Sequence, residues 1–233
     1  MKTRQTGFTL VEIAIVLVII GLLLGGILKG QEMIVQAKIK NAIQDFSGIS
    51  AAYYGYQDRY RAIPGDDAGA AARWLTPTVA TSGNGNSILE GAYNATAVTG
   101  PPAGPESLLW WDDLRRSGFV TGALGLTNPT NAFSGLIGVM QGDGTGVTGT
   151  PPGPVLASTT PVIPGFTNLI MCSTNLPDKV AIALDVQMDD GAPNSGAVRG
   201  LEVAGAPLPA AMATADTSYV ENGTNTYTLC RQF

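Results

Sequence analysis

The chain opens with a short polar segment that leads into a long apolar one. Residues 1–7 read MKTRQTG and hold two basic side chains, whereas residues 8–28 read FTLVEIAIVLVIIGLLLGGIL, with Glu12 as their one charge. A helix rises ~1.5 Å per residue, so this apolar run would reach about the ~30 Å of a bilayer core. Since basic residues in front of such a span stay cytoplasmic, we expect the chain after Leu28 to lie outside the cytoplasm.

The position of the apolar run also indicates where the chain would be processed. An ordinary secretory signal has a short apolar region followed by a small-residue cleavage site. Here the apolar run exceeds 20 residues and continues directly into a patterned helix, so we expect a cut before the run. A cut after Gly7 would make Phe8 the new N-terminus and Glu12 the fifth residue of the mature chain.

Glu12 is the exceptional residue of the apolar run. An unpaired carboxylate is costly to bury, and an ionisable group inside a membrane span indicates a function. We expect the new amine of one subunit to neutralise Glu12 of its neighbour as the helices stack with an axial offset. The alternative is a carboxylate that extends to the membrane interface and has no role in assembly.

Beyond residue 30 the pattern becomes amphipathic. Apolar and aromatic residues recur at steps of three and four, as expected for one buried face of a helix; they are Ile39, Ile43, Phe46, Ile49, Tyr53, Tyr56 and Tyr60. We therefore predict one helix from Phe8 to about Tyr60, ~80 Å long at ~1.5 Å per residue. Pro64 and Gly65 should end it. Its second half should be the spine on which a globular head packs.

The remainder of the chain predicts a loop-rich head. Residues 73–105 and 127–164 are rich in Gly, Thr, Ser, Asn and Pro, which is typical of loops. Glu106–Arg116 has the amphipathic pattern of a short helix. Val180–Met188 alternates like a strand, but it contains two alanines and follows Pro177, so we favour a helix. Short apolar runs predict the strands of a small antiparallel sheet: Leu136–Met140, Leu169–Cys172, Val198–Val203 and Tyr227–Cys230.

These patterns predict an α+β protein in four parts. The parts are a leader (1–7), a transmembrane and assembly helix (8–30), an amphipathic spine helix (31–62) and a globular head (63–233). The head would carry the small sheet and the long loops.

The composition restricts the functions open to this head. The chain has no histidine, which excludes the triads and zinc sites that depend on imidazole. Its net charge of −5 is unfavourable for binding nucleic acid, which needs clustered Lys and Arg. Because a nucleophile motif such as G-x-S-x-G is also missing, a membrane-anchored hydrolase is the least favoured function, and we expect no enzymatic activity.

Cys172 and Cys230 are the two cysteines of the chain. They lie too far apart in the sequence for a zinc or redox motif. In an exported head, such a pair predicts one disulfide that ties the C-terminal region to the core. The alternative is two buried free thiols.

Acidic residues in glycine-containing loops are the remaining candidates for chemistry. Oxygen-rich loops suit a hard cation, which makes one late loop a candidate for calcium. Its candidate ligands are Asp185, Asp189, Asp190 and Asn194, although they lack the D-x-D-x-D-G spacing. Paired carboxylates could also serve a glycosidase. The alternative for all of them is an ordinary role as solvated loop and cap residues, with no cofactor.

The junction Gly7-Phe8-Thr9-Leu10-Val11-Glu12, followed by an unbroken apolar helix, resembles the prepilin leader of type IV pilins and type II secretion pseudopilins. The resemblance implies that prepilin peptidase cleaves between Gly7 and Phe8, that Phe8 is N-methylated, and that Glu12 serves assembly. It also implies three kinds of partner: identical or related pilin subunits, the peptidase, and an assembly platform in the inner membrane.

One departure concerns the flexibility of the helix. Many major pilins carry a proline inside this segment, whereas the first proline here is Pro64. Four glycines would let the helix loosen locally, and their spacing suits close packing between helices; they are Gly21, Gly25, Gly26 and Gly30. In the head, residues 60–67, 111–118 and 185–196 are similar to a subgroup of pilin-like proteins, which does not identify a filament system.

Two functions from different classes follow from these observations. The first is a structural subunit that polymerises into a type IV pilus or a type II secretion pseudopilus. The second is a minor pilin or tip adhesin whose head binds a surface, a partner or exported cargo. In both, the chain would cross the inner membrane once, with its head extracytoplasmic, before it joins an extracellular pilus or a periplasmic pseudopilus.

Overall fold

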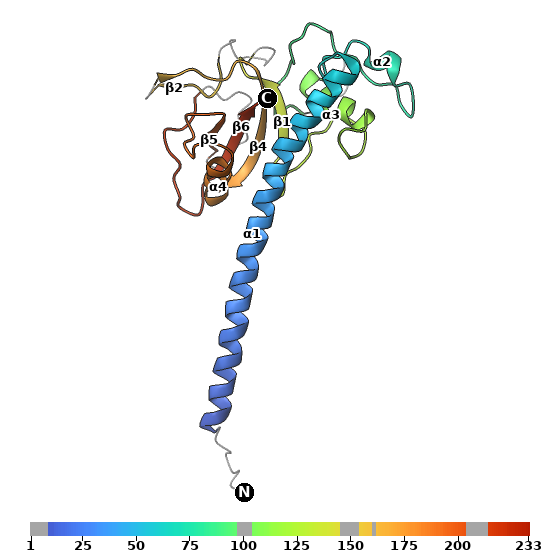
Figure 1. Cartoon of the computed structure of the whole chain (residues 1–233). Coiled ribbons are helices and arrows are strands. Elements are labelled where there is room, and N and C mark those ends of the chain that lie inside the picture. Colours follow the sequence, from blue (N-terminus) through green and yellow to red (C-terminus); the bar gives the residue numbers. More distant parts are fainter. Residues whose placement is uncertain (1–8, 97–103, 145–153, 160–161, 204–213) are drawn as a thin grey trace.

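A single helix of 51 residues, α1 (Leu10–Tyr60), forms a stalk with a globular head around its C-terminal half (Figure 1). The computed structural model describes residues 9–96, 104–144, 154–159, 162–203 and 214–233. At ~1.5 Å per residue the helix is about 77 Å long. The predicted α+β architecture, with a long N-terminal helix and a head that contains a small antiparallel sheet, is confirmed.

α1 ends at Tyr60, as predicted, but not by the expected means. Pro64 and Gly65 were expected to end the helix, and the chain leaves it before reaching them. Arg61 adopts a left-handed conformation (φ 56°), and its backbone N–H donates to the carbonyl oxygen of Gln57 at 2.8 Å. This arrangement satisfies one of the free carbonyl groups at the end of the helix, so the proline is not needed to stop it.

Burial divides α1 into two halves. Residues 9–29 and 31–37 are exposed, and from Ile39 onward one face is buried against the head. The buried positions follow steps of three and four, as one face of a helix requires; they are Ile39, Ala42, Phe46, Ile49, Ala52 and Tyr56. The expected spine is therefore confirmed, with two alanines added to it, although three of its predicted members, Ile43, Tyr53 and Tyr60, are only half-buried.

The head contains a four-stranded antiparallel sheet in the order β1-β4-β6-β5. The strands are β1 (Ile137–Gln141), β4 (Leu169–Pro177), β5 (Val198–Glu202) and β6 (Thr226–Gln232). All four coincide with predicted strands, although β4 is longer and its register shifts between Ser173 and Leu176. A separate two-stranded sheet, β2 (Ser158–Thr159) and β3 (Val162–Ile163), lies in a segment that was expected to be a loop.

The head helices cover one face of this sheet. The helix predicted over Glu106–Arg116 is confirmed as α3. The ambiguous segment is a helix, α4 (Asp178–Met188), and a short α2 (Ala70–Arg73) precedes them. One core joins α1 and α3 to β1 and β4, and a second joins α1 and α4 to β6 and β5. The other face of the sheet packs against loop residues such as Tyr93 and Phe166.

Buried carboxylates hold the long loops in place. Asp66 accepts hydrogen bonds from the backbone N–H groups of Gly85, Asn86 and Ser87, at 2.6, 3.1 and 2.7 Å. In the same way, Asp178 at the start of α4 accepts from the N–H groups of residues 222 and 223, at 2.7 and 2.6 Å. These bonds satisfy backbone donors that no helix or sheet would satisfy, which explains how so irregular a head can be ordered.

Candidate functional site

The first candidate site is the exposed half of α1. Its side chains from Leu10 to Leu28 are almost all apolar, and every one of these residues is exposed. Within the described residues, α1 is the one helix long and apolar enough to cross a membrane. An apolar surface of this size needs lipid or other protein to cover it.

Glu12 occupies the first turn of α1, where it takes part in a capping box with Thr9. The N–H and the hydroxyl of Thr9 donate to the Glu12 carboxylate at 2.8 and 2.9 Å, and the Glu12 N–H donates to the Thr9 hydroxyl at 3.3 Å. This role was not predicted from the sequence, although the spacing Thr-x-x-Glu before an apolar run is its signature. Gly7 and Phe8, the predicted processing residues, lie outside the described residues.

The four glycines of the apolar half lie on an open surface. α1 runs through Gly21, Gly25, Gly26 and Gly30 as one continuous helix. A Cβ atom added at any of them would meet no other part of the chain within 4 Å. These positions are therefore accessible to a neighbouring helix at short range.

The two cysteines form a disulfide. Cys172 on β4 and Cys230 on β6 are directly paired in the antiparallel register, and their sulfur atoms are 2.04 Å apart. Both residues are fully buried on the loop-covered face of the sheet. The bond joins the last strand of the chain to the centre of the sheet.

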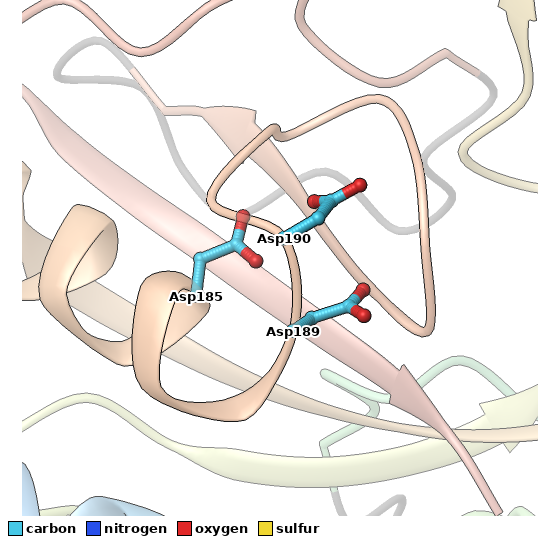
Figure 2. Close-up of side chains that lie close together, drawn as sticks. All are labelled: Asp185, Asp189 and Asp190. Atoms are coloured by element: carbon cyan, nitrogen blue, oxygen red, sulfur yellow. The ribbon is translucent and has the colours of Figure 1, made fainter.

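The second candidate site is the acidic group at the C-terminal end of α4 (Figure 2). Asp185, Asp189 and Asp190 each bring a carboxylate oxygen to within 4.8 Å of the others. The fourth predicted ligand, Asn194, is buried and directs its side-chain amide toward the Ser158 hydroxyl at 3.4 Å. Three of the four predicted residues are therefore brought together.

Each of the three carboxylates also accepts hydrogen bonds, Asp189 and Asp190 from their own loop and Asp185 also from a residue between β5 and β6. Asp185 accepts from the Tyr219 hydroxyl at 2.6 Å, and Asp189 accepts from the N–H groups of residues 197 and 198 at 2.5 and 2.9 Å. Asp190 accepts from the Ser195 hydroxyl at 2.5 Å and from the N–H of residue 192 at 2.9 Å. The group thus shapes the turn that leads from α4 into β5.

The protonation of this group differs from one carboxylate to another. Burial raises the pKa of Asp185 to about 6, and the charges of the two neighbouring carboxylates act in the same direction. The hydrogen bond from Ser195 holds the pKa of Asp190 below its usual range. The group can offer oxygen ligands to a hard cation such as calcium, which would be bound best when Asp185 is ionised.

The other paired carboxylates lie at the junction of α1 and α3. Asp67 accepts from the Tyr56 hydroxyl at 2.7 Å and pairs with Arg73. Asp112 pairs with Arg116 at 2.6 Å, and Asp113 accepts from the N–H of residue 65 at 2.7 Å. Asp113 thus joins the segment after α1 to α3, and Asp67 joins that segment to α1.

Comparison with known proteins identifies the N-terminal region. Residues 2–28 match the family model described as a prokaryotic N-terminal methylation motif. This motif is the signature of type IV pilins and pseudopilins, so the resemblance found in the sequence is confirmed for this region. No curated protein and no solved structure matches the chain.

Proposed function

We propose that the chain is a structural subunit of a type IV pilus-like or type II secretion pseudopilus filament. The observation that carries the proposal is the change of burial along one continuous helix. The N-terminal half of α1 is exposed and apolar, whereas the C-terminal half is covered by the head. This arrangement suits a subunit that is held first by lipid and later by the helices of neighbouring subunits.

The methylation motif supports a defined processing route. Prepilin peptidase would cleave between Gly7 and Phe8 and methylate the new amine of Phe8. The precursor would cross the inner membrane once, with the head outside the cytoplasm, and an inner-membrane assembly platform would add it to identical or related subunits. The motif also favours a structural protein over an enzyme.

Glu12 would change its partner during assembly. In the free chain its carboxylate accepts from Thr9, which keeps it satisfied before any neighbour arrives. In the filament it would instead neutralise the methylated amine of an adjacent subunit. Removing one partner of a buried ion pair typically costs ~3–5 kcal/mol, which is enough to prevent a weakly nucleated polymer from forming.

The experiment compares filament yields of Glu12 variants at matched membrane levels of subunit. Glu12→Val should leave insertion intact, since it removes a group that is costly in a membrane, but should reduce filament yield at least tenfold. Thr9→Ala removes the capping box and keeps the carboxylate, and Glu32→Val removes an exposed carboxylate of the same helix. Both of these variants should assemble.

Two outcomes would contradict the proposal. If Glu12→Val filaments form at the wild-type yield, the pairing between subunits does not exist. If Thr9→Ala fails as severely as Glu12→Val, Glu12 acts through the helix cap. The intact mass of the wild-type subunit, taken from the same filaments, should correspond to a chain that starts at methylated Phe8, and a species that retains Met1 would refute the processing route.

The alternative is a minor pilin or tip adhesin whose head binds a surface, a partner or cargo. A groove on the head beside the end of α1 favours a binding role in addition to assembly. Copy number separates the two possibilities, because a major subunit dominates sheared filaments and a minor one is scarce in them.

A further inference from the structure

Two adjoining clefts form one groove along the last two turns of α1. The larger has a volume of about 650 Å³ and the smaller about 280 Å³. They share Ile63 and Ser87 as lining residues, so they lie next to each other. Ordinary ligand sites have volumes of ~300–1,000 Å³. The larger cleft falls within this range and the smaller one lies just below it. We call the combined surface the α1 groove.

One wall of the α1 groove is a row of side chains on α1. Tyr53, Tyr54, Gln57 and Tyr60 all line it. Tyr53, Gln57 and Tyr60 follow each other at steps of four and three, and Tyr54 lies three residues before Gln57, which places all four along one side of the helix. The Gln57 amide donates to the Tyr53 hydroxyl at 2.7 Å, and the Tyr54 side chain is 55% exposed. The wall therefore alternates aromatic surface with hydrogen-bonding groups.

The rest of the lining includes four separate segments. The loop at Ser87 is fixed by Asp66, which accepts its N–H at 2.7 Å. Gln141 at the end of β1 and Asn168 before β4 add two side-chain amides. The C-terminal residue, Phe233, closes this side, and its N–H donates to the carbonyl oxygen of Leu169 at 3.1 Å.

The aromatic rings of the groove are held from behind. The Tyr53 ring stacks on buried Trp110 with 5.2 Å between centroids and lies 5.1 Å from the ring of Phe233. The centroids of the Tyr60 and Tyr56 rings are 4.6 Å apart. The Arg73 guanidinium lies 4.3 Å from the centroid of the Tyr60 ring. A surface that is already ordered loses little entropy when a ligand binds, which raises its affinity.

We infer that the α1 groove binds a neutral, linear oligosaccharide. The aromatic faces would take the apolar faces of successive sugar rings, and the amides and carboxylates would take their hydroxyl groups. The larger cleft is lined by Asp66, Asp67 and Arg61, and Asp67 pairs with Arg73, so its charges are nearly balanced. Such a lining, on a chain of net charge −5, lacks the clustered cations that phosphates, nucleic acids and acidic polymers need. The elongated form suits a chain of sugars better than a single one.

This inference rests on the extracytoplasmic position of the head in the proposed function, and it does not depend on assembly. It therefore goes beyond the filament role and gives the head a ligand of defined chemistry. A subunit that is unable to polymerise would keep the α1 groove unchanged, because Glu12 lies at the other end of α1 (Figure 1).

The test uses the full chain in zwitterionic detergent micelles, so that no sugar detergent competes. The probes are hexamers of β-1,4-linked N-acetylglucosamine, β-1,4-linked glucose and α-1,4-linked glucose, titrated by calorimetry and by tryptophan fluorescence, to which Trp110 behind Tyr53 contributes. We expect saturable binding of at least one probe. Tyr54→Ala should weaken it roughly 3- to 10-fold, the effect of losing one aromatic contact.

Control variants separate the groove from the rest of the molecule. Leu75→Ala, at an exposed apolar residue outside the groove, should bind like the wild type. Glu12→Val should also bind like the wild type, which distinguishes failure of this inference from failure of the filament proposal. Thermal unfolding of each variant checks that the head is folded.

Three results would overturn the inference. The first is no saturable binding of any of the three hexamers by the wild-type chain. The second is unchanged affinity in Tyr54→Ala. The third is self-association of the head that Tyr54→Ala abolishes and that added sugars do not change. This result would assign the α1 groove to a second copy of the chain.

Discussion

Asp113 makes the stability of the head dependent on pH. The residue lies on α3, is 1% exposed, and accepts a hydrogen bond from the N–H of Gly65. Burial raises the pKa of its carboxyl to about 7, and the charges of Asp67 and Asp112 act in the same direction. The hydrogen bond from Gly65 and the charge of Arg73 oppose this increase without cancelling it.

The direction and size of the effect follow from proton linkage. The ordinary pKa of an Asp carboxyl is 3.8, so between pH 4 and 7 the native state binds more protons here than the unfolded state. The stability contributed by this site is therefore fully present below pH 4 and is lost as pH rises toward 7. At ~1.4 kcal/mol for each tenfold change in proton affinity, the loss is at most about 4 kcal/mol.

Asp113→Asn removes this dependence and keeps an oxygen that accepts from Gly65. We expect the variant to be about 2–4 kcal/mol more stable than the wild type at pH 8 and nearly equal to it at pH 4. Urea unfolding in micelles, followed by tryptophan fluorescence, measures the difference, since Trp110 and Trp111 are buried on the same helix. Asp58→Asn, at an exposed carboxylate, should show no difference at either pH. A variant that is no more stable than the wild type at pH 8 would refute the reasoning.

Two further predictions concern the other sites. The disulfide joins residues 58 positions apart, for which loop entropy predicts about 4 kcal/mol of stabilisation. Cys172→Ala/Cys230→Ala should lose about this amount in urea unfolding, and free alkylation of both thiols in the native exported protein would contradict the bond. Millimolar calcium should raise the unfolding temperature more at pH 7.5 than at pH 5, because the pKa of Asp185 is raised to about 6 and a cation needs the ionised carboxylate. Asp190→Asn should abolish the calcium effect, and an equal or absent shift at both pH values would exclude the site.

Local sequence patterns predicted the helices and strands of this fold well. The apolar run and the stripe that follows it are long and strongly periodic, which is the condition under which such patterns are most dependable. α3 was found at its observed bounds because its apolar face is regular and Gly118 follows it. The four main strands were found from their apolar runs, but the extension of β4 to Pro177 was not, since Asn175 and Pro177 are poor strand residues.

Apart from the disulfide, which followed from the presence of two cysteines in an exported head, features that depend on distant contacts were not predicted. The strand order β1-β4-β6-β5 is set by how the sheet packs on three helices, which no local pattern contains. The anchoring of the loop at Gly85 by Asp66 joins residues 19 positions apart, and nothing in the local sequence shows this partnership. The α1 groove combines α1, a loop, β1 and the C-terminus, so it exists only in the folded chain. The acidic group at the end of α4 was found because its members are near neighbours in sequence.

The continuity of α1 has a geometric consequence for any filament. Between Leu28, the last residue of the apolar run, and Ile39, where the head begins to cover the helix, there is one uninterrupted helical segment. Each residue of a helix advances the chain by about 100° of rotation and ~1.5 Å of height. One residue inserted here would turn the head by about 100° around the filament interior, whereas seven would restore its direction to within about 20° and raise it by about 10 Å. The number of residues in this segment therefore fixes the direction in which the head points around the helix axis, and its height along that axis, relative to Glu12.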